Sequence, residues 1–418
     1  MMTFNGHRRR RAAAAVTALA VGSLLAACGS TTSNASGSGS GSSSSSSSVP
    51  GITSNTITIG ATEPITGKAA TAGQGLEAGI KIATQYINAH GGVNGKKINA
   101  IILDDGFIQS REIANIRQLV SQDHVYAIVD PAGSQGIAGT WDFMKQAGTP
   151  MWGPISPSDP KLPNVYLLVA SRTAQQEVAI DYFAKQGLTR IAAIGEDDDL
   201  GLSLKDALAQ QVPKHPGMKV VANETLPVST SDVSAAVLAV KNANPQALII
   251  STNNTSVGLI LKEMGNLGLH IPAYADQGAA NTGGVGAVGP AGSAANGFLG
   301  GLQVDLPTSN TQAVQTWRAQ AQQYSGPQGL SAFSLQTYMQ EMAFVEVLKR
   351  MGSDYSWSNF QKTANGLASN PITLGALPPI ACGPLPDGHT CGNQSEIAKF
   401  DATTQTWSVI QGFTAPQS

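Results

Sequence analysis

The chain has 418 residues, enough for two domains and a sizeable core, and charged residues make up only 12 % of it. The formal net charge is −2, and removing Arg8 to Arg11 near the N-terminus leaves 21 basic against 27 acidic side chains, or −6. This balance excludes a general nucleic-acid binder, which needs a basic surface.

Residues 1–27 have the pattern of a secretory signal peptide, with a basic start and a short apolar run over residues 12–27. That run is too short for a comfortable transmembrane helix. The sequence Leu25-Ala26-Ala27-Cys28 resembles a bacterial lipobox, in which Cys28 becomes the lipidated first residue of the mature protein. The alternative is an ordinary signal peptide with a chance cysteine.

Residues 28–51 predict a flexible tether, because they consist almost entirely of Ser, Gly, Thr and Asn up to position 48. Such a segment cannot bury apolar surface and behaves as a random coil. We expect it to hold the folded part away from a membrane surface. The alternative is a low-complexity insert without a role.

The first folded unit is predicted over residues 56–105 as a strand, a loop, a helix and a second strand. Residues 56–59 alternate β-branched side chains, and residues 98–103 form the next apolar strand. The helix over residues 73–89 places its apolar side chains on one face, and these are Leu76, Ile80, Ala83 and Ile87. Gly91 and Gly92 end that helix. The crossover between the two parallel strands should be right-handed.

This unit also carries a resemblance to a known family. The matching residues are Pro64-Ile65-Thr66-Gly67, the run AHGGVNG at 89–95, and the pair Asp104-Asp105. Together they resemble the opening of type I periplasmic binding proteins, and in particular the leucine/isoleucine/valine-binding proteins of ABC importers. The resemblance extends from about residue 52 to the C-terminus.

Strands and helices continue to alternate after this unit, which predicts parallel sheets covered on both faces. The predicted strands are 126–129, 151–152, 165–169, 190–194, 219–226, 247–250, 273–275 and 298–304. The predicted helices are 110–122, 133–146, 175–185, 202–211, 232–242, 257–267, 311–324 and 335–351. Apolar side chains of the last helix, such as Phe344 and Leu348, are expected in the core.

The resulting fold class is α/β, with two doubly wound, Rossmann-like parallel-sheet lobes. The resemblance implies that three crossings join the lobes around a hinged ligand cleft. It assigns residues 52–170 and 299–352 to the first lobe, and residues 171–298 and 353–418 to the second. The strand over residues 298–304 is thereby expected to return to the first lobe.

In open parallel sheets, ligands bind outside the carboxyl ends of the strands. In the first lobe this rule and the resemblance select two loops, which contribute Ser134, Gln135, Ser156 and Ser158. In the amino-acid binders these loops present hydroxyl and backbone N–H groups to the ligand's carboxylate. The alternative for each serine is a helix N-cap, a role that can coexist with anion binding.

In the second lobe the candidates are Asn253, Asn254 and Gln277. Amino-acid binders carry an acid where Gln277 stands, and they place aromatic residues at positions that correspond here to Ala72, Leu200 and the two asparagines. The predicted pocket therefore offers donors and acceptors without charge. This favours a small polar ligand such as an amide or a polyol. An α-amino acid stays possible, because Asp276 or Asp198 could supply the carboxylate.

The acidic pairs of the sequence predict neither a metal site nor a catalytic dyad. Asp104 and Asp105 are adjacent on a strand and point to opposite faces, which indicates a structural role at the strand end. Residues 196–199 lack the alternating spacing and the terminal glutamate of a calcium loop. We therefore expect no metal and no cofactor.

The chain has three cysteines, and Cys382 and Cys391 flank a short loop. If Cys28 is lipidated, these two are left to form a disulfide in an exported protein. The alternative is a zinc or copper site that includes His389, for which no fourth ligand lies nearby in sequence.

Three functions are in competition. The first is a lipid-anchored receptor of an ABC importer, on the extracytoplasmic face of the cell membrane and with permease subunits as partners. The second is a ligand sensor of the same fold that signals to a partner protein. The third is an exported enzyme, against which stands the lack of a G-x-S-x-G, H-E-x-x-H or P-loop motif and of any catalytic residue pattern.

Overall fold

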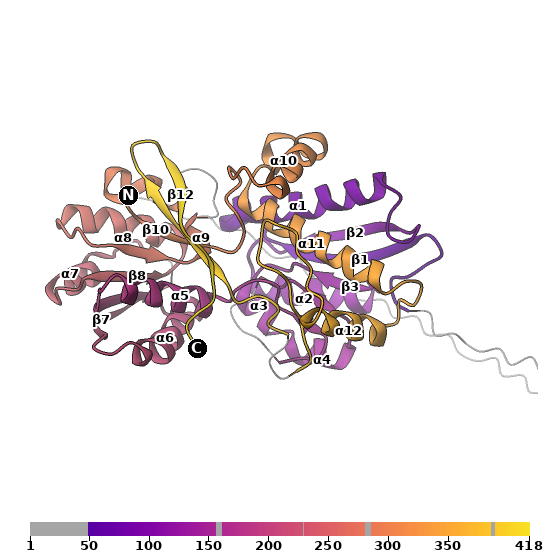
Figure 1. Ribbon diagram of the computed structural model, residues 1–418, viewed down its shortest axis with the longest axis horizontal. Helices are drawn as coiled ribbons and strands as arrows, with labels where there is room; N and C mark the ends of the chain where they lie inside the picture. Colours follow the sequence, from indigo (N-terminus) through magenta and orange to yellow (C-terminus); the bar gives the residue numbers. More distant parts are fainter. Residues whose placement is uncertain (1–48, 156–160, 229, 281–285, 386–388) are drawn as a thin grey trace, which may run out of the picture. The chain divides into compact units, whose positions relative to one another are not determined.

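Two β-sheets flanked by helices organise the chain in the computed structural model (Figure 1). The structure describes residues 49–155, 161–228, 230–280, 286–385 and 389–418. Within this part of the chain, no helix has both the length and the apolar character needed to cross a membrane. The predicted signal peptide, Cys28 and most of the tether lie outside the described residues.

The first sheet has five parallel strands in the order β2-β1-β3-β4-β5. Its strands are β1 Thr56–Glu63, β2 Lys97–Asp104, β3 Ala127–Val129, β4 Met151–Trp152 and β5 Val165–Tyr166. β1 lies between β2 and β3, and its β-branched Ile57 and Ile59 are fully buried. Burial of both sheet faces explains the apolar strands that the sequence shows.

Helices from both halves of the chain cover the first sheet (Figure 1). They are α1 Ala70–Ala89, α2 Gln109–Ser121, α3 Ser134–Ala138, α4 Trp141–Ala147, α10 Gln312–Tyr324, α11 Ala332–Arg350 and α12 Trp357–Asn365. α1 packs closely on α11, where the Thr337 hydroxyl donates to the Leu76 carbonyl over 2.9 Å. A Cβ on Gly79 would lie 2.0 Å from that hydroxyl, so this contact requires a glycine.

The second sheet has seven strands in the order β12-β11-β10-β9-β8-β6-β7. Its strands are β6 Arg190–Glu196, β7 Lys219–Leu226, β8 Ala247–Ser251, β9 Ala273–Ala275, β10 Leu299–Leu302, β11 Ser395–Asp401 and β12 Thr406–Thr414. The strands from β7 to β10 are parallel, and β10-β11-β12 are antiparallel. The two sheets confirm the predicted α/β class.

The helices of the second sheet alternate with its parallel strands in sequence, beginning with one helix before β6. They are α5 Arg172–Lys185, α6 Asp199–Gln211, α7 Ser234–Asn242, α8 Asn254–Asn266 and α9 Gln277–Ala280. Short 3-10 helices complete the fold at Gly67–Ala69, Val212–Lys214, Gly286–Ala295, Gly326–Gly329 and Gly366–Ala368. The second core lies between these helices and the sheet.

The structure corrects two predicted assignments. The strand predicted at 298–304 does not return to the first sheet, because β10 pairs in parallel with β9 and antiparallel with β11. Residues 353–385 and 389–392, predicted in the second lobe, contribute instead to the first core. Phe360 of α12 lies there with its ring centroid 5.9 Å from those of Trp152 and Tyr166. Both assignments depend on contacts between residues far apart in sequence, which local sequence patterns do not show.

The three connections between the sheets run close together. The Ala170 carbonyl of the first connection accepts hydrogen bonds from the side-chain amides of Gln175 and Gln303. The Cys391 amide of the third connection donates to the Leu167 carbonyl over 2.7 Å. These contacts confirm three crossings, which lie near residues 168–171, 303–306 and 392–395.

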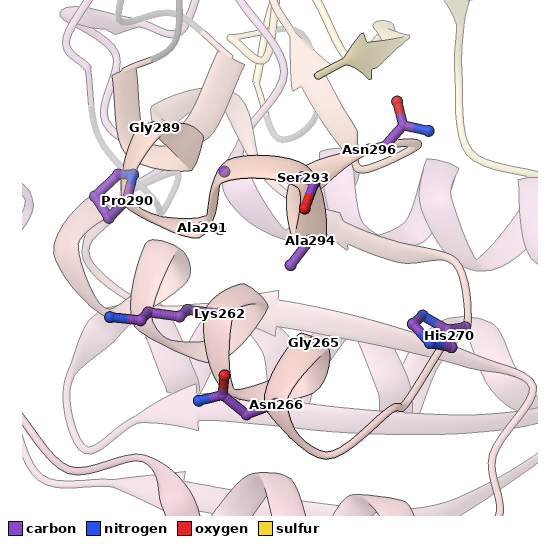
Figure 2. A pocket seen from close by; sticks show the side chains of 11 residues that line it. Lys262, Gly265, Asn266, His270, Gly289, Pro290, Ala291, Ser293, Ala294 and Asn296 are labelled. Atoms are coloured by element: carbon purple, nitrogen blue, oxygen red, sulfur yellow. The ribbon is translucent and has the colours of Figure 1, made fainter. Parts of the chain in front are cut away.

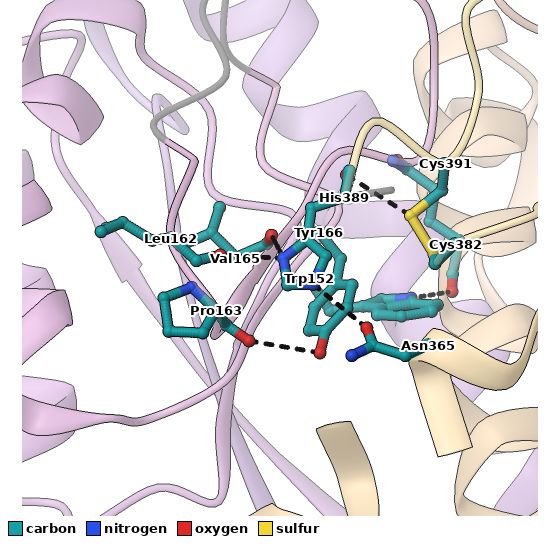
Figure 3. The surroundings of a disulfide bond; sticks show 10 residues. Trp152, Leu162, Pro163, Val165, Tyr166, Asn365, Cys382, His389 and Cys391 are labelled. Carbon is teal, nitrogen blue, oxygen red and sulfur yellow. Dashed lines mark hydrogen bonds between the residues drawn. A yellow bond between two sulfur atoms is a disulfide. The ribbon is translucent and has the colours of Figure 1, made fainter. Parts of the chain in front are cut away.

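The predicted disulfide between Cys382 and Cys391 is confirmed (Figure 3). His389 lies in the loop that the disulfide closes. Its Nδ1 is 2.8 Å from the Leu162 carbonyl oxygen, and its Nε2 is 3.1 Å from Asn365 Oδ1. Its ring also stacks on Tyr166 with centroids 4.3 Å apart. Both ring nitrogens are therefore engaged away from the sulfur atoms, which argues against the alternative metal site.

Replacing Cys382 and Cys391 with serine should lower the free energy of unfolding by about 2–3 kcal/mol, because the unfolded chain loses a loop constraint. Urea denaturation of the oxidised wild type and the double variant measures this difference. The reduced wild type is the control and should match the variant. Two titratable thiols at these positions in non-reduced, denatured protein would contradict the disulfide.

Candidate functional site

The carboxyl ends of the parallel strands are where a ligand site is expected in such sheets. In the first lobe β3 and β4 end beside each other, and the loops that follow them are paired. The Ile155 amide donates to the Pro131 carbonyl over 2.9 Å, and the Ala132 amide donates to the Thr62 carbonyl over 3.2 Å. The two loops predicted to bind the ligand are thus joined to each other and to the end of β1.

The predicted first-lobe residues can be placed only in part. Ser134 and Gln135 are the first two residues of α3, and their side chains lie outside the described residues. Ser156 and Ser158 lie outside them altogether. The roles of these four residues therefore stay predictions.

The loop before α3 packs on a buried glutamate that the sequence analysis missed. Glu112 of α2 is 3 % exposed, and its Oε2 atom would lie 2.3 Å from a Cβ on Gly133 and 1.8 Å from one on Gly136. Both positions consequently exclude a side chain. Burial, with a smaller contribution from Asp105, raises the pKa of Glu112 to about 9. The glycines on either side of Ser134 and Gln135 were the sequence signal for this close approach.

In the second lobe Asn253 follows β8 and caps α8. Its side-chain oxygen accepts hydrogen bonds from the amides of Thr255 and Ser256, and its Nδ2 donates to Glu196. Both ends of the side-chain amide are engaged, so a ligand contact from this side chain would have to replace one of these bonds. Asn254, the first residue of α8, is partly exposed.

The two acids considered for an ammonium group already have partners. Asp276, directly after β9, lies 2.8 Å from the Arg172 guanidinium, and its side chain is 6 % exposed. Asp198 caps α6 by accepting from the Leu200 amide over 2.9 Å. Gln277 opens α9, but its side chain lies outside the described residues. The described carboxylates thus serve the second lobe itself.

A buried polar network lies under the carboxyl ends of β6 and β8. Gln176 of α5 is fully buried and donates through Nε2 to the Ser251 hydroxyl over 2.7 Å. Ser251 in turn donates to the Leu200 carbonyl over 2.7 Å. A glutamine within a helical pattern carries no signal of such a role, so the sequence could not reveal it.

Asp104 and Asp105 have separate structural roles, as predicted. Asp104 accepts from the hydroxyl and the amide of Thr66, and the hydroxyl bond is the main cause of its lowered pKa. Asp105 is buried and accepts from the Thr62 hydroxyl over 3.0 Å. In the described ranges, no group of three or more His, Cys, Asp or Glu side chains could hold a metal ion.

A groove of about 720 Å³ lies elsewhere on the second lobe (Figure 2). It is lined by the C-terminal half of α8, including Lys262 and Asn266, by His270, and by residues 289–294 and Asn296. These residues lie toward the end of α8 that is remote from Asn253. The groove therefore lies toward the amino ends of the parallel strands, whereas the candidate ligand loops follow their carboxyl ends.

Comparisons with known proteins agree with this architecture. Residues 56–395 match the sequence profile of the family described as periplasmic binding protein. An amino acid binding protein of Pseudomonas aeruginosa is 28 % identical over 229 residues, which are 53 % of this chain and 60 % of that protein. A leucine-, isoleucine-, valine-, threonine-, and alanine-binding protein of the same organism is 26 % identical over 294 residues, or 68 % of this chain and 77 % of that protein.

A solved structure gives the same fold. It belongs to a possible leucine/isoleucine/valine-binding protein from Rhodopirellula baltica SH 1 and superposes with a TM-score of 0.75. The match covers 87 % of this chain and 97 % of that chain, at 19 % sequence identity.

Replacing Asn253 with alanine should lower the free energy of unfolding by about 1 kcal/mol, because α8 loses the acceptor for its first amides. Asn253→Ser keeps a capping oxygen and should recover most of this loss. Urea denaturation of the three proteins measures both effects. An alanine variant as stable as the wild type would contradict the capping role.

Proposed function

Because the chain belongs to the periplasmic binding protein family, we propose that it is a lipid-anchored receptor that captures a small polar solute for an ABC importer. Members of this family bind solutes and are not enzymes, and they act outside the cytoplasm. The predicted resemblance to the branched-chain amino-acid binders is confirmed by the family match. The observation that carries the proposal is this match over residues 56–395, which includes both sheets up to the start of β11.

The proposed ligand is a small polar molecule such as an amino acid, an amide or a polyol. We assign its binding to Ser134, Gln135, Ser156 and Ser158 of the first lobe, and to Asn253, Asn254 and Gln277 of the second. Support comes from the relatives, which bind amino acids, and from the engaged state of Asp198 and Asp276. Position 277 carries a neutral amide where the amino-acid binders carry an acid. This difference favours ligands that have no ammonium group to be neutralised.

The proposed mechanism is closure of the two lobes around the ligand. Three adjacent crossings can act as a hinge, and a ligand that contacts both lobes stabilises the closed form. Closure would then present a joint surface to the permease subunits. A sensor that signals to a partner protein instead would use the same closure, and the presence of permease and ATPase genes beside its gene would distinguish the two.

A thermal-shift screen against amino acids, amides, polyols and sugars tests the binding function. A ligand at 100 times its Kd stabilises the native state by about 2.7 kcal/mol. The Cys382/Cys391 double serine variant is the reference, because its expected change in stability is similar in size. The difference between its unfolding temperature and that of the wild type shows how large a ligand-induced shift should be. If no compound in these classes shifts the unfolding temperature, the proposed ligand class is wrong.

Changing Gln277 to glutamate should shift the ligand preference toward molecules with an ammonium group. The wild type should bind leucine and valine poorly, because a missing charge-assisted hydrogen bond costs about 1.5–3 kcal/mol. This corresponds to about 10- to 150-fold in affinity. Calorimetry with L-leucine on both proteins measures the change.

Gln277→Asn is the matched control, since it keeps an uncharged amide at the same position. It should not gain affinity for leucine. Tight binding of leucine or valine by the wild type would show that the departure from the family pattern has another meaning.

Replacing Cys28 with serine should release the protein from the membrane fraction, because lipidation of this residue is the proposed anchor. The motivation is Leu25-Ala26-Ala27-Cys28 followed by the Ser/Gly tether. Membrane fractionation and mass spectrometry of the N-terminus measure the result. A wild-type protein that is wholly soluble with an unmodified N-terminus rejects the anchor.

A further inference from the structure

Five carboxyl groups are buried at the carboxyl ends of the first sheet and on the helices beside it. Their side chains are no more than 3 % exposed, and they are Glu63, Asp105, Glu112, Asp130 and Glu341. Asp105 and Glu112 have the structural contacts described above. Glu63, Asp130 and Glu341 have no part in the proposed ligand contacts, so their burial calls for a separate explanation.

These three carboxyl groups lack hydrogen-bond partners. Among the residues that the structure describes, neither oxygen of Glu63, of Asp130 or of Glu341 has one. Two neutral amides of α11 are in the same situation. Gln336 is fully buried with both side-chain polar atoms unpaired, and Gln340 has an unpaired Oε1, within the described ranges. An ionised carboxylate in such surroundings is very costly, so the neutral form is favoured.

The charged groups that act on the three carboxyl groups do not relieve this cost. Asp130 is influenced by Glu341 and Glu63 in addition to its burial, and all three effects raise its pKa. The pKa of Glu63 is raised by burial first and then by neighbouring acids, which are Asp105, Glu112 and Glu77. Burial alone raises the pKa of Glu341. Repulsion between like charges reinforces the preference for neutral groups.

The cluster lies beside the described parts of the two first-lobe loops, which are residues 130–133 and 153–155. Asp130 follows β3 with φ 45°, Gly153 follows β4 with φ 70°, and the Asp130 amide donates to the Trp152 carbonyl over 2.8 Å. A Cβ on Gly153 would lie 2.4 Å from Asp130 Oδ1 and 2.8 Å from Gln340 Nε2. The acid of one loop and the amide of α11 therefore meet at the backbone of the other loop.

α11 is in turn tied to the same strand end. The Trp152 indole donates to the Gln340 carbonyl over 3.0 Å, and the Gln340 amide nitrogen lies 3.4 Å from the Gly153 carbonyl oxygen. Glu341 is the next residue of this helix and is fully buried. A charge on Asp130 or Glu341 would stay out of contact with water unless the surrounding backbone moved, because both residues are fully buried.

We propose that Asp130 and Glu341, together with Glu63, position the two first-lobe ligand loops only while their carboxyl groups are neutral, so that the loop arrangement depends on bound protons. They are positioning residues, since they act on the loops rather than on the ligand. This inference rests on the proposed function for the claim that these loops bind the ligand. The order of the loops themselves can be tested without any ligand.

The direction of the pH effect follows from the raised pKa values. Each group holds a proton in the native state at a pH where the unfolded chain has released it, so stability falls as pH rises. This loss of stability begins once the pH exceeds the ordinary pKa of a carboxyl group. It continues until the pH has passed the raised pKa of that group in the native state. We therefore expect ordered loops at mildly acidic pH and progressive loss of order toward alkaline pH.

Hydrogen exchange of the full-length protein, measured by mass spectrometry without ligand, tests the proposal. The amides of Ala132 and Ile155 join the loops, so their protection reports the loop arrangement. After correction for intrinsic exchange, the protection factors of the wild type should fall by about tenfold or more between about pH 6 and about pH 9. A tenfold fall is the change that a pKa difference of about one unit produces. The variants Asp130→Asn and Glu341→Gln carry a permanently neutral group and should show a much smaller change.

Three further proteins separate positioning from a merely structural role. Asp130→Ala should lose protection even at low pH, and Asp130→Asn should restore it. Glu346→Gln, on the more exposed side of α11 where Glu346 pairs with Arg350, should keep the wild-type pH dependence. If Asp130→Asn does not fold, Glu341→Gln and the wild-type titration still decide the question.

Protection that is independent of pH in the wild type would overturn the proposal. A pH dependence in both amide variants as large as that of the wild type would also overturn it. A pH-dependent exchange that disappears in these variants supports it. If that result is obtained while no compound of the thermal-shift screen binds, the proposed function fails and the proton-dependent positioning stands.

Discussion

The burial of α11 against α1 and the first sheet is the constraint on which the rest of the structure depends. Parallel strands must be covered on both faces, and the nearest helices in sequence do not suffice for the face that holds Trp152. Phe344 of α11 supplies this cover, with ring centroids 6.1 Å from Trp152 and 6.5 Å from Tyr126. Because α11 comes after β10 in the chain, the chain must return from the second sheet, and it must cross again to form β11.

The crossings are consequently close together, and this has a functional meaning for a solute-binding protein. Residues near Ala170, Gln303 and Gly392 share a small space, where a Cβ on Gly392 would lie 2.4 Å from the Leu168 carbonyl oxygen. Motion of one lobe against the other must be absorbed by these segments. In the proposed lobe closure, a few backbone positions of these connections would absorb the motion, as in hinge closure generally.

The two lobes differ in how the polar side chains at their strand ends are hydrogen-bonded. In the second lobe side chains satisfy one another, as with Asn253 and Glu196 or Arg172 and Asp276. In the described part of the first lobe, Glu63, Asp130 and Glu341 are buried at the strand ends without such partners. If the loops of the first lobe respond to protonation as proposed, the two lobes would offer the ligand two different surfaces.

The sequence by itself determined the features that depend on local physics. The spacing of Leu76, Ile80, Ala83 and Ile87 predicts α1, the alternation in residues 56–59 predicts β1, and Cys382 and Cys391 are close enough in sequence to pair. The alternation of strands and helices predicted the α/β class, and the rule for parallel sheets, together with the family resemblance, located the loops after β3, β4, β8 and β9. Local patterns suffice here because each involves residues within a few turns of the chain.

Only the tertiary structure decided which sheet receives β10, where α12 packs and which polar side chains are already engaged. A strand such as Leu299–Leu302 reads alike in either sheet, since its partners Tyr274 and Lys399 are distant in sequence. The same holds for Asn253, whose donors are committed to Glu196 and Ser256, and for Glu63, Asp130 and Glu341. Burial and pairing are properties of long-range contacts, and no pattern within a single segment encodes them.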